Sequence, residues 1–357
     1  MPNDDKIEFG DGDGDGDPGD GDGDGDGDPG DGDGDGDVTC TPIVDSITIT
    51  DDTDLASVAC VEVVLGDLTV GPTTQLIDLQ ALASLREVGG TATIVGNLAL
   101  TSLEGLEGLE SVTWLHIRRN RNLSDLHGLD GLVALDQLTV ASNAGLTSLA
   151  GLPSELAPRT LEIAENLLLA SLDGLPVFVD PSTSDALLVD IDGNPALIDL
   201  GGLSDCCAAQ AVDLTVASND ALTDLGGLEA FTRLERLRLY DDRGLLSLAG
   251  LDALSSLGTL DIAYDHCSED AAPVLPDLSG APNLADLDVL QVQWVDSLTS
   301  LAGLGAITEL GKLQVRNNAA LPWEAVLALE AQTAPGVVDT CGGVGGPTCA
   351  AAPCPNL

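Results

Sequence analysis

Three consecutive stretches of the sequence decide the fold. NLALTSLEGLEGLESVTWLHIRR begins at Asn97, NRNLSDLHGLDGLVALDQLTVAS at Asn120 and NAGLTSLAGLPSELAPRTLEIAE at Asn143. Each stretch is 23 residues long and begins with the same frame, N-x-x-L-x-x-L-x-G-L, followed by further regularly spaced leucines. A repeat of this length is typical of a solenoid, in which each coil buries its leucines against the next coil.

The frame continues along most of the chain. Its asparagine recurs at Asn166, Asn194, Asn219 and Asn318, is replaced by aspartate at Asp242 and Asp265, and gives way to Val295 one step before Asn318. The steps after Asn166, Asn194 and Asp265 are longer because loops are inserted there, VFVDPSTSD among them. We expect each asparagine to turn inward at a corner and bond the backbone of adjacent coils, and aspartate to supply the acceptor half of that role.

A short alternating segment precedes each corner: LHI, LTV, LEI, LTV, LRL, LDI, LQV and LQV. Such alternation predicts a strand with two side chains pointing inward, and stacked coils would align these strands in parallel. SITIT at 46–50, GDLTV at 66–70 and TATIV at 91–95 extend the series upstream. The predicted fold is a β-rich solenoid, a leucine-rich-repeat-like right-handed coil with one continuous parallel sheet and about 10–12 rungs of ~23 residues.

Composition and turn residues agree with this fold. Hydrophobic residues make up 44% of the chain and aromatic residues 2%, so the core must consist of thin aliphatic layers. Glycines in the S-L-x-G-L turn should permit a tight bend. They are Gly105, Gly128, Gly151, Gly174, Gly202, Gly227, Gly250 and Gly303. WEAVLALEAQ predicts a short helix near the C-terminus. We therefore expect a linker at 1–38, the solenoid at 39–330, and a cysteine-containing cap or tail at 331–357.

The chain is strongly acidic, with a formal net charge of −48. Residues 10–37 are almost pure Gly-Asp, which predicts an extended, disordered linker. Asp11, Asp13, Asp15 and Gly16 match half of a calcium loop, but a twelfth-position glutamate and flanking helices are missing. We expect no cofactor beyond weak, non-specific Ca²⁺ binding there. Nucleic acid is excluded as a partner because its binding requires basic side chains.

Eight cysteines favour an oxidising compartment, although MPNDDKIEFG contains no apolar signal segment. We expect an extracellular or surface protein whose export signal, with or without a lipid tether, lies outside this sequence. The alternative is a cytosolic protein with free thiols. Apolar runs are too short for a transmembrane helix. Adjacent Cys206 and Cys207 form either a vicinal disulfide or two small buried hydrophobes. One pair is expected among Cys341, Cys349 and Cys354, and Cys267 has no evident partner.

From CTPIVDSITITDDTDLASVACVEVVLGDLTV through the L-x-S-L-x-G-L-x-x-L repeats, roughly residues 40–330, the chain resembles the receptor L-domain family of leucine-rich-repeat relatives. It is also similar to the bacterial surface repeats of the internalin kind. The N-x-x-L spacing from Asn143 to Leu146 departs from the standard N-x-L and favours the receptor L-domain side. The resemblance implies extracellular recognition of protein or glycan, no catalytic residue, and a disulfide that joins Cys40 to Cys60 as an N-terminal cap. The Gly-Asp stalk looks like those of predatory or gliding bacteria.

No catalytic or metal-binding constellation is evident. The three histidines, His116, His127 and His266, are scattered over different repeats, and no Gly-x-Ser-x-Gly elbow or phosphate loop occurs. His266 beside Cys267 comes closest to a metal site, but paired C-x-x-C knuckles are missing. We therefore expect no enzyme and no metal site.

Five of the twelve basic residues fall on strand positions that should face outward from the sheet. With their neighbours they form three candidate ligand-binding groups: Trp114, His116 and Arg118; Arg236, Arg238 and Tyr240; Lys312, Gln314 and Arg316. Arginine and aromatic residues are enriched at binding hot spots, which favours an acidic glycan or protein segment as ligand. The equally weighted alternative is that these residues offset nearby Asp190, Asp213 and Asp261. The predicted function is non-enzymatic extracellular recognition or adhesion on an acidic stalk; the alternatives are a structural envelope or matrix spacer and, less favoured, a carbohydrate-active enzyme.

Overall fold

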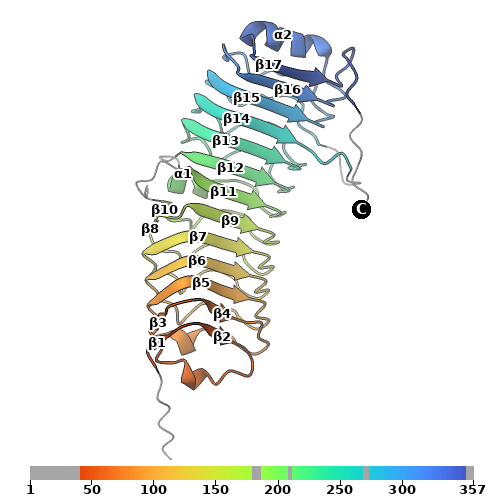
Figure 1. The fold of residues 1–357 in the computed structure, drawn as a ribbon. Helices are drawn as coiled ribbons and strands as arrows, with labels where there is room; N and C mark the ends of the chain where they lie inside the picture. Colours follow the sequence, from red (N-terminus) through yellow and green to blue (C-terminus); the bar gives the residue numbers. More distant parts are fainter. Residues whose placement is uncertain (1–40, 179–185, 208–210, 268–272, 351–357) are drawn as a thin grey trace, which may run out of the picture. The chain divides into compact units, whose positions relative to one another are not determined.

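The computed structural model describes residues 41–178, 186–207, 211–267 and 273–350. The chain divides into two units, Met1–Asp37 and Val38–Leu357. The first unit, with the predicted Gly-Asp linker and its candidate calcium residues, lies outside the described residues. The second unit is a parallel β-solenoid, as the repeat predicts (Figure 1).

One sheet of 15 strands runs through this unit, and every neighbouring pair in it is parallel. Its strands are β1 Ile43–Val44, β2 Ile47–Ile49, β3 Val63–Val64, β4 Leu68–Val70, β5 Glu87–Val95, β6 Ser111–Arg118, β7 Ala134–Ala141, β9 Thr160–Ala164, β11 Leu187–Asp192, β12 Val212–Ala217, β13 Arg233–Tyr240, β14 Ser256–Ala263, β15 Asp286–Gln293, β16 Lys312–Arg316 and β17 Val337–Cys341. The first two coils each contribute two short strands, so among the described residues thirteen coils carry the sheet, and twelve of these precede β17. The predicted continuous parallel sheet is confirmed.

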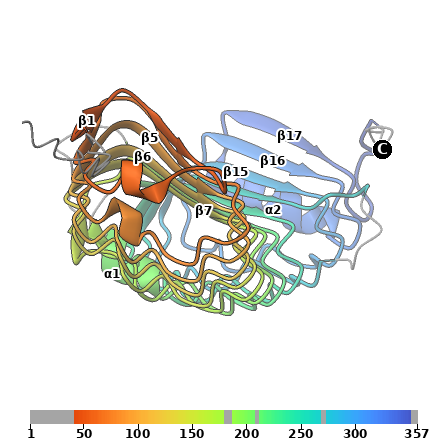
Figure 2. The same ribbon diagram turned by 90° about the horizontal axis from the view of Figure 1, so that it is seen from below.

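The core is mainly aliphatic, with a few buried aromatic rings such as Phe231. It fills the interior between the sheet and the returning turns, whose backbone Figure 2 shows from below. In β13 the burial pattern alternates so that Leu237 and Leu239 point inward while Arg238 points outward. The leucines of the turns, such as Leu245 and Leu248, are also fully buried. Each coil therefore closes its own apolar interior only through contact with the coils on both sides, which explains why a single repeat could not fold alone.

A ladder of asparagines stabilises one corner of the solenoid, as the repeat frame predicts. From Asn120 onward, the side-chain oxygen of each ladder asparagine accepts the backbone N–H of the residue at the same position in the preceding coil, as Asn143 does from Asn120 at 3.0 Å. The oxygen of Asn97 accepts the hydroxyl of Thr73 instead. The side-chain nitrogen donates to a strand carbonyl in the preceding coil, as Asn143 does to Ile117 at 2.8 Å. The members are fully buried and comprise Asn97, Asn120, Asn143, Asn166, Asn194 and Asn219, with Asn318 farther along.

The prediction that aspartate continues the ladder holds at Asp242 and is wrong at Asp265. Asp242 is buried and accepts the backbone N–H of Asn219 at 2.9 Å. Asp265 is exposed, and Tyr264 turns inward in its place and donates its hydroxyl to the carbonyl oxygen of Asp242 at 3.0 Å. The physical reason is backbone conformation: residues such as Asp241, which precede inward ladder side chains, have φ of +54° to +69°, whereas Tyr264 does not adopt a positive φ.

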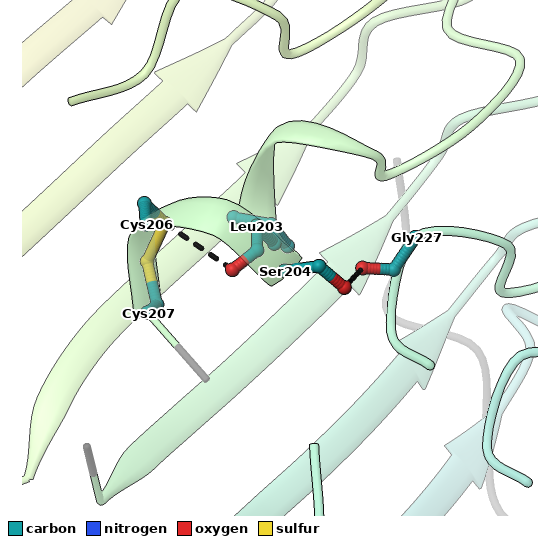
Figure 3. The surroundings of a disulfide bond; sticks show 5 residues. All are labelled: Leu203, Ser204, Cys206, Cys207 and Gly227. Carbon is teal, nitrogen blue, oxygen red and sulfur yellow. Dashed lines mark hydrogen bonds between the residues drawn. A yellow bond between two sulfur atoms is a disulfide. The ribbon is translucent and has the colours of Figure 1, made fainter. Parts of the chain in front are cut away.

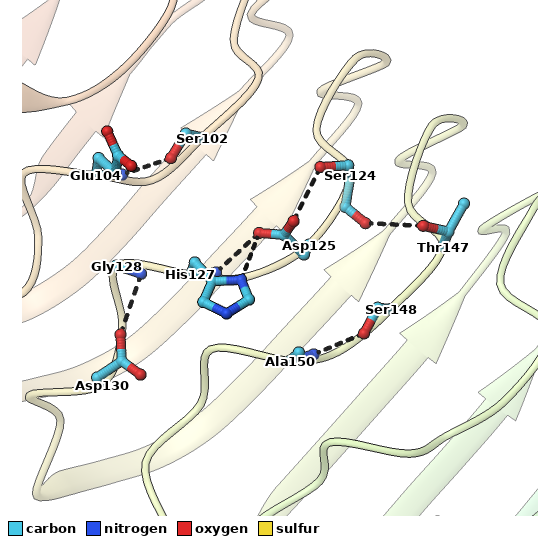
Figure 4. Close-up of polar contacts among 10 residues, drawn as sticks. All are labelled: Ser102, Glu104, Ser124, Asp125, His127, Gly128, Asp130, Thr147, Ser148 and Ala150. Atoms are coloured by element: carbon cyan, nitrogen blue, oxygen red, sulfur yellow. Dashed lines mark hydrogen bonds and ion pairs between the residues drawn. The ribbon is translucent and has the colours of Figure 1, made fainter.

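A second set of polar bonds shapes the turns on the way back from the ladder. Ser102, Asp125 and Ser148 each accept, through a side-chain oxygen, the backbone N–H two residues later (Figure 4). The next glycine follows at a positive φ; a Cβ on Gly250, for example, would lie 2.1 Å from the carbonyl oxygen of Leu225. Gly202 differs from the predicted tight bend, because it begins helix α1 (Gly202–Cys207).

The short helices and two short strands lie outside the main sheet, which β17 ends. Strands β8 (Glu155–Leu156) and β10 (Val177–Phe178) form a separate two-stranded sheet. Short 3₁₀ helices occupy Leu55–Ser57 and Gln80–Leu82. Helix α2 (Trp323–Thr333) confirms the predicted C-terminal helix and buries Val326 and Leu329. Strand β17, in the segment predicted as a cap or tail, pairs with β16 and ends the sheet.

Candidate functional site

The outward side chains of β5, β6, β7, β9 and β11 to β17 form one surface, here called the sheet face. Parallel register aligns them into columns that cross the strands. One column runs through Trp114, Gln137 and Thr160, and continues to Arg236 and Lys312. All nine predicted binding residues lie on this face, half-buried or exposed, as the alternation on the strands predicts.

The structure does not bring the three predicted groups together. They lie on β6, β13 and β16, and the sheet order places β7, β9, β11 and β12 between the first two. At a strand spacing of ~4.8 Å, β6 and β13 are about 24 Å apart, and β13 and β16 about 14 Å. A single ligand that contacted all three groups would have to extend along the solenoid.

The residues of the β13 group form ion pairs and a hydrogen bond with carboxylates of the adjoining strands. Arg236 and Arg238 both pair with Asp213 on β12, at 2.7 and 3.1 Å. Tyr240 donates its hydroxyl to Asp261 on β14. Burial, together with this bond, raises the pKa of Tyr240 to about 12. These pairings are those expected if the basic residues offset neighbouring acids.

The β6 group is arranged differently. Arg118 pairs with Glu162 on β9 at 3.2 Å, across Thr139, whose hydroxyl also donates to Glu162 at 2.9 Å. Burial, reinforced by the nearby Arg118 guanidinium, lowers the pKa of His116, so this imidazole is neutral at pH 7. Trp114 is 46% exposed and presents an aromatic surface beside it.

The β16 group also contacts its neighbours. The Lys312 ammonium donates to the side-chain oxygen of Gln291 at 2.9 Å, and Arg316 pairs with Asp339 on β17 at 3.6 Å. Such half-exposed ion pairs contribute little to stability, so they can rearrange at small cost when a partner approaches.

A hollow of about 460 Å³ lies in the sheet face between β5 and β11. Two small side chains at adjacent positions of one column, Ala141 and Ala164, help to line it. The charged or polar residues that line it are Thr93, His116, Arg118, Arg119, Ser142, Glu162, Glu165 and Asp192. The hollow was not predicted from the sequence; the signal that could have indicated it is alanine at facing positions of two neighbouring repeats.

Carboxylates gather beside this hollow. Burial raises the pKa of Asp190, and the carboxylates of Asp192 and Glu162 raise it further. Burial likewise raises the pKa of Asp192, where Glu165 and Asp241 add to the effect. The middle of the sheet face is therefore negative, with Arg118 and Arg119 on one side and the arginines of β13 on the other.

The cysteines are oxidised wherever the structure describes them. Cys206 and Cys207 form a vicinal disulfide at the end of α1, where both are buried (Figure 3). Cys341 is joined to Cys349. Cys60 is disulfide-bonded, and so is Cys267, for which the sequence indicated no partner. Cys40 and Cys354 lie outside the described residues.

The three histidines lie in three separate places among the described residues. Ligand atoms of Asp265, His266 and Cys267 lie within 4.8 Å of one another, but Cys267 is disulfide-bonded and offers no thiolate. The His266 ring stacks on Trp294, with ring centroids 3.8 Å apart. His127 lies at a turn and contacts Asp125 at 3.0 Å. Within the described part of the chain, the three histidines are thus in three unrelated settings.

No helix among the described residues is long and apolar enough to cross a bilayer. Comparison with known protein families and with curated protein sequences found no match to this chain.

Proposed function

We propose that this protein is a non-enzymatic recognition or adhesion module, displayed outside the cell, which binds protein or glycan through the sheet face. The observation that carries the proposal is the sheet face itself: an open array of arginine, carboxylate, amide and aromatic side chains beside a hollow. The resemblance to receptor L-domains and the oxidised cysteines support an extracellular setting. The acidic Gly-Asp segment would serve as a stalk.

Of the two ligand classes, the contacts favour a glycan. Arg236 and Arg238 already share the carboxylate of Asp213, so a purely anionic partner would compete with a paired acid. Sugar hydroxyls both donate and accept hydrogen bonds, and can therefore bridge guanidinium and carboxylate groups without separating them. The exposed Trp114 and the half-buried Tyr240 add aromatic surfaces, which are common at binding hot spots.

A glycan array and a pull-down from extracellular polymer, both with the whole chain, test this proposal. Arg236→Gln with Arg238→Gln should reduce selective binding at least 10-fold. The matched control is Arg159→Gln with Arg233→Gln, which removes two arginines that pair with Asp136 and Glu235. If Arg236→Gln with Arg238→Gln leaves selective binding unchanged, the ligand does not bind at this part of the sheet face.

The second candidate function is a structural envelope or matrix spacer. It is favoured by the internal pairing of the basic residues and by the formal net charge of −48, which promotes hydration and solubility. A spacer should show no selective ligand on the array or in the pull-down. Turnover of a polysaccharide panel would instead support the third candidate, a carbohydrate-active enzyme.

A further inference from the structure

The buried corner ladder contains one carboxylate, Asp242, which is 1% exposed. Its Oδ1 accepts both the backbone N–H and the side-chain Nδ2 of Asn219, at 2.9 and 3.3 Å. Its second oxygen, Oδ2, is buried and has no hydrogen-bond partner among the described residues. A buried polar atom without a partner is uncommon and calls for a physical explanation.

The neighbouring rungs show what this position requires. At the atom that corresponds to Oδ2, the asparagines carry Nδ2, which donates to a strand carbonyl of the preceding coil: Asn194 to Ile163 and Asn219 to Ile191, both at 2.9 Å. Ile191 is in register with Val216, so the equivalent carbonyl for Asp242 is that of Val216. An ionised carboxylate cannot donate a hydrogen bond, whereas a protonated carboxyl group can.

The charges around Asp242 also disfavour ionisation. Burial has the largest effect, and the carboxylates of Asp192, two coils earlier, and of Asp220 beside Asn219 add to it; together they raise the pKa of Asp242 to about 7. In its own corner, Arg243 pairs with Asp241 at 3.4 Å.

On the following coil, Tyr264 faces Asp242 and donates its hydroxyl to the backbone carbonyl of Asp242. Asp265 lies exposed at the next corner, where its N–H bonds to Asp241. The carboxylate of Asp265 accepts the N–H of Cys267. It therefore does not accept the N–H of Asp242, as the carboxylate of Asp242 accepts that of Asn219. Asp242 thus stands at the last rung before the interruption.

We propose that Asp242 is a proton-operated switch in the ladder. With a proton on Oδ2 it replaces an asparagine and donates that O–H to the carbonyl oxygen of Val216. When the proton leaves to solvent, the group becomes a buried, unpartnered anion beside Asp192 and Asp220, and the corner that joins β12, β13 and β14 loosens. The switch would make the cohesion of the solenoid at this corner depend on pH.

The direction of the pH effect follows from linkage. Asp242 binds its proton more tightly in the folded chain than in the unfolded chain, where its pKa is near 3.8. Its contribution to stability is therefore fully present below about pH 4 and is lost as the pH rises through about 7. Over that window the folding equilibrium constant of the wild-type chain should fall by about 10³-fold relative to a variant that cannot ionise at this position.

Asp242→Asn provides that variant, since it restores the side chain found on the neighbouring rungs. Urea unfolding of the whole chain is followed by circular dichroism from pH 4 to 8.5. The difference in unfolding free energy, Asp242→Asn minus wild type, should increase as the pH rises to about 7 and should stay constant above about pH 8. Asp220→Asn is the matched control: it removes one exposed charge near Asp242 but leaves Asp242 able to ionise. It should keep a wild-type-like pH slope, displaced slightly to lower pH because Asp220 contributes to the raised pKa of Asp242. Parallel pH slopes for wild type and Asp242→Asn would overturn the proposal.

A direct titration keeps the proposal testable even if a variant folds poorly. In wild-type protein with ¹³C-labelled aspartate, the Asp242 carboxyl resonance should titrate near pH 7. The resonance is assigned by its absence from the Asp242→Asn spectrum, or from its contact with labelled Asn219 in wild type. A midpoint near the ordinary value of 3.8 would refute the protonated state.

Discussion

Replacing Asn143 with alanine tests the corner ladder most directly. Asn143 is fully buried; its oxygen accepts the N–H of Asn120 at 3.0 Å and its nitrogen donates to the carbonyl oxygen of Ile117 at 2.8 Å. Asn143→Ala would leave both backbone groups buried without these partners. Each such group costs about 1–3 kcal/mol, so we expect a loss of about 2–6 kcal/mol in unfolding free energy.

Asn122→Ala is the matched control. It removes the same kind of side chain from the adjoining coil, together with a bond of 2.8 Å to the carbonyl oxygen of Leu98, but that bond is exposed to water. Water can replace it, so the expected change is within about 0.5 kcal/mol.

Two measurements should be combined, because long repeat arrays need not unfold in one cooperative step. Urea unfolding of the whole chain gives the global change. Hydrogen exchange then reports locally: the amide of Asn120 should lose protection in Asn143→Ala and keep it in Asn122→Ala. The claim that the ladder holds the coils together would be refuted by equal losses of unfolding free energy in the two variants. It would also be refuted if the Asn120 amide stayed protected in Asn143→Ala.

Two further predictions concern the turns and the C-terminal coil. Gly250 has a positive φ of 107° and a Cβ there would lie 2.1 Å from the carbonyl oxygen of Leu225, so Gly250→Ala should cost about 2–3 kcal/mol in thermal or urea unfolding. Gly305→Ala, with no atom within 4 Å of the added Cβ, should change stability by less than about 0.5 kcal/mol; a similar loss in both would contradict the steric argument. Cys349→Ser opens the disulfide to Cys341, which closes a short loop next to β17, and should cost about 2–3 kcal/mol locally. Hydrogen exchange would then show loss of protection in β17 first, and unchanged protection there would contradict the prediction.

The 23-residue spacing determined the architecture by itself. Leucines at fixed intervals must all face inward in every coil, and one coil exposes them unless a neighbour covers them, so stacking follows from the spacing alone. The inward role of the asparagines was also predictable, because a buried corner carbonyl needs a donor that leucine does not provide.

Contacts between coils were decided only by the tertiary structure. Asp213 meets Arg236 and Arg238 because the strand register places residues 23 and 25 positions apart on adjoining strands. The hollow beside Ala141 and Ala164 depends in the same way on what the flanking coils contribute.

The corner aspartates show where the sequence pattern stops. Asp242 and Asp265 occupy the same place in the repeat frame, yet one is buried in the ladder and the other is exposed. The difference comes from Tyr264, whose ring fills the interior and whose hydroxyl bonds the preceding coil. A repeat frame specifies which residue types recur, but the burial of a given carboxylate, and hence its proton affinity, depends on the backbone conformation and on the side chains of the adjoining coils.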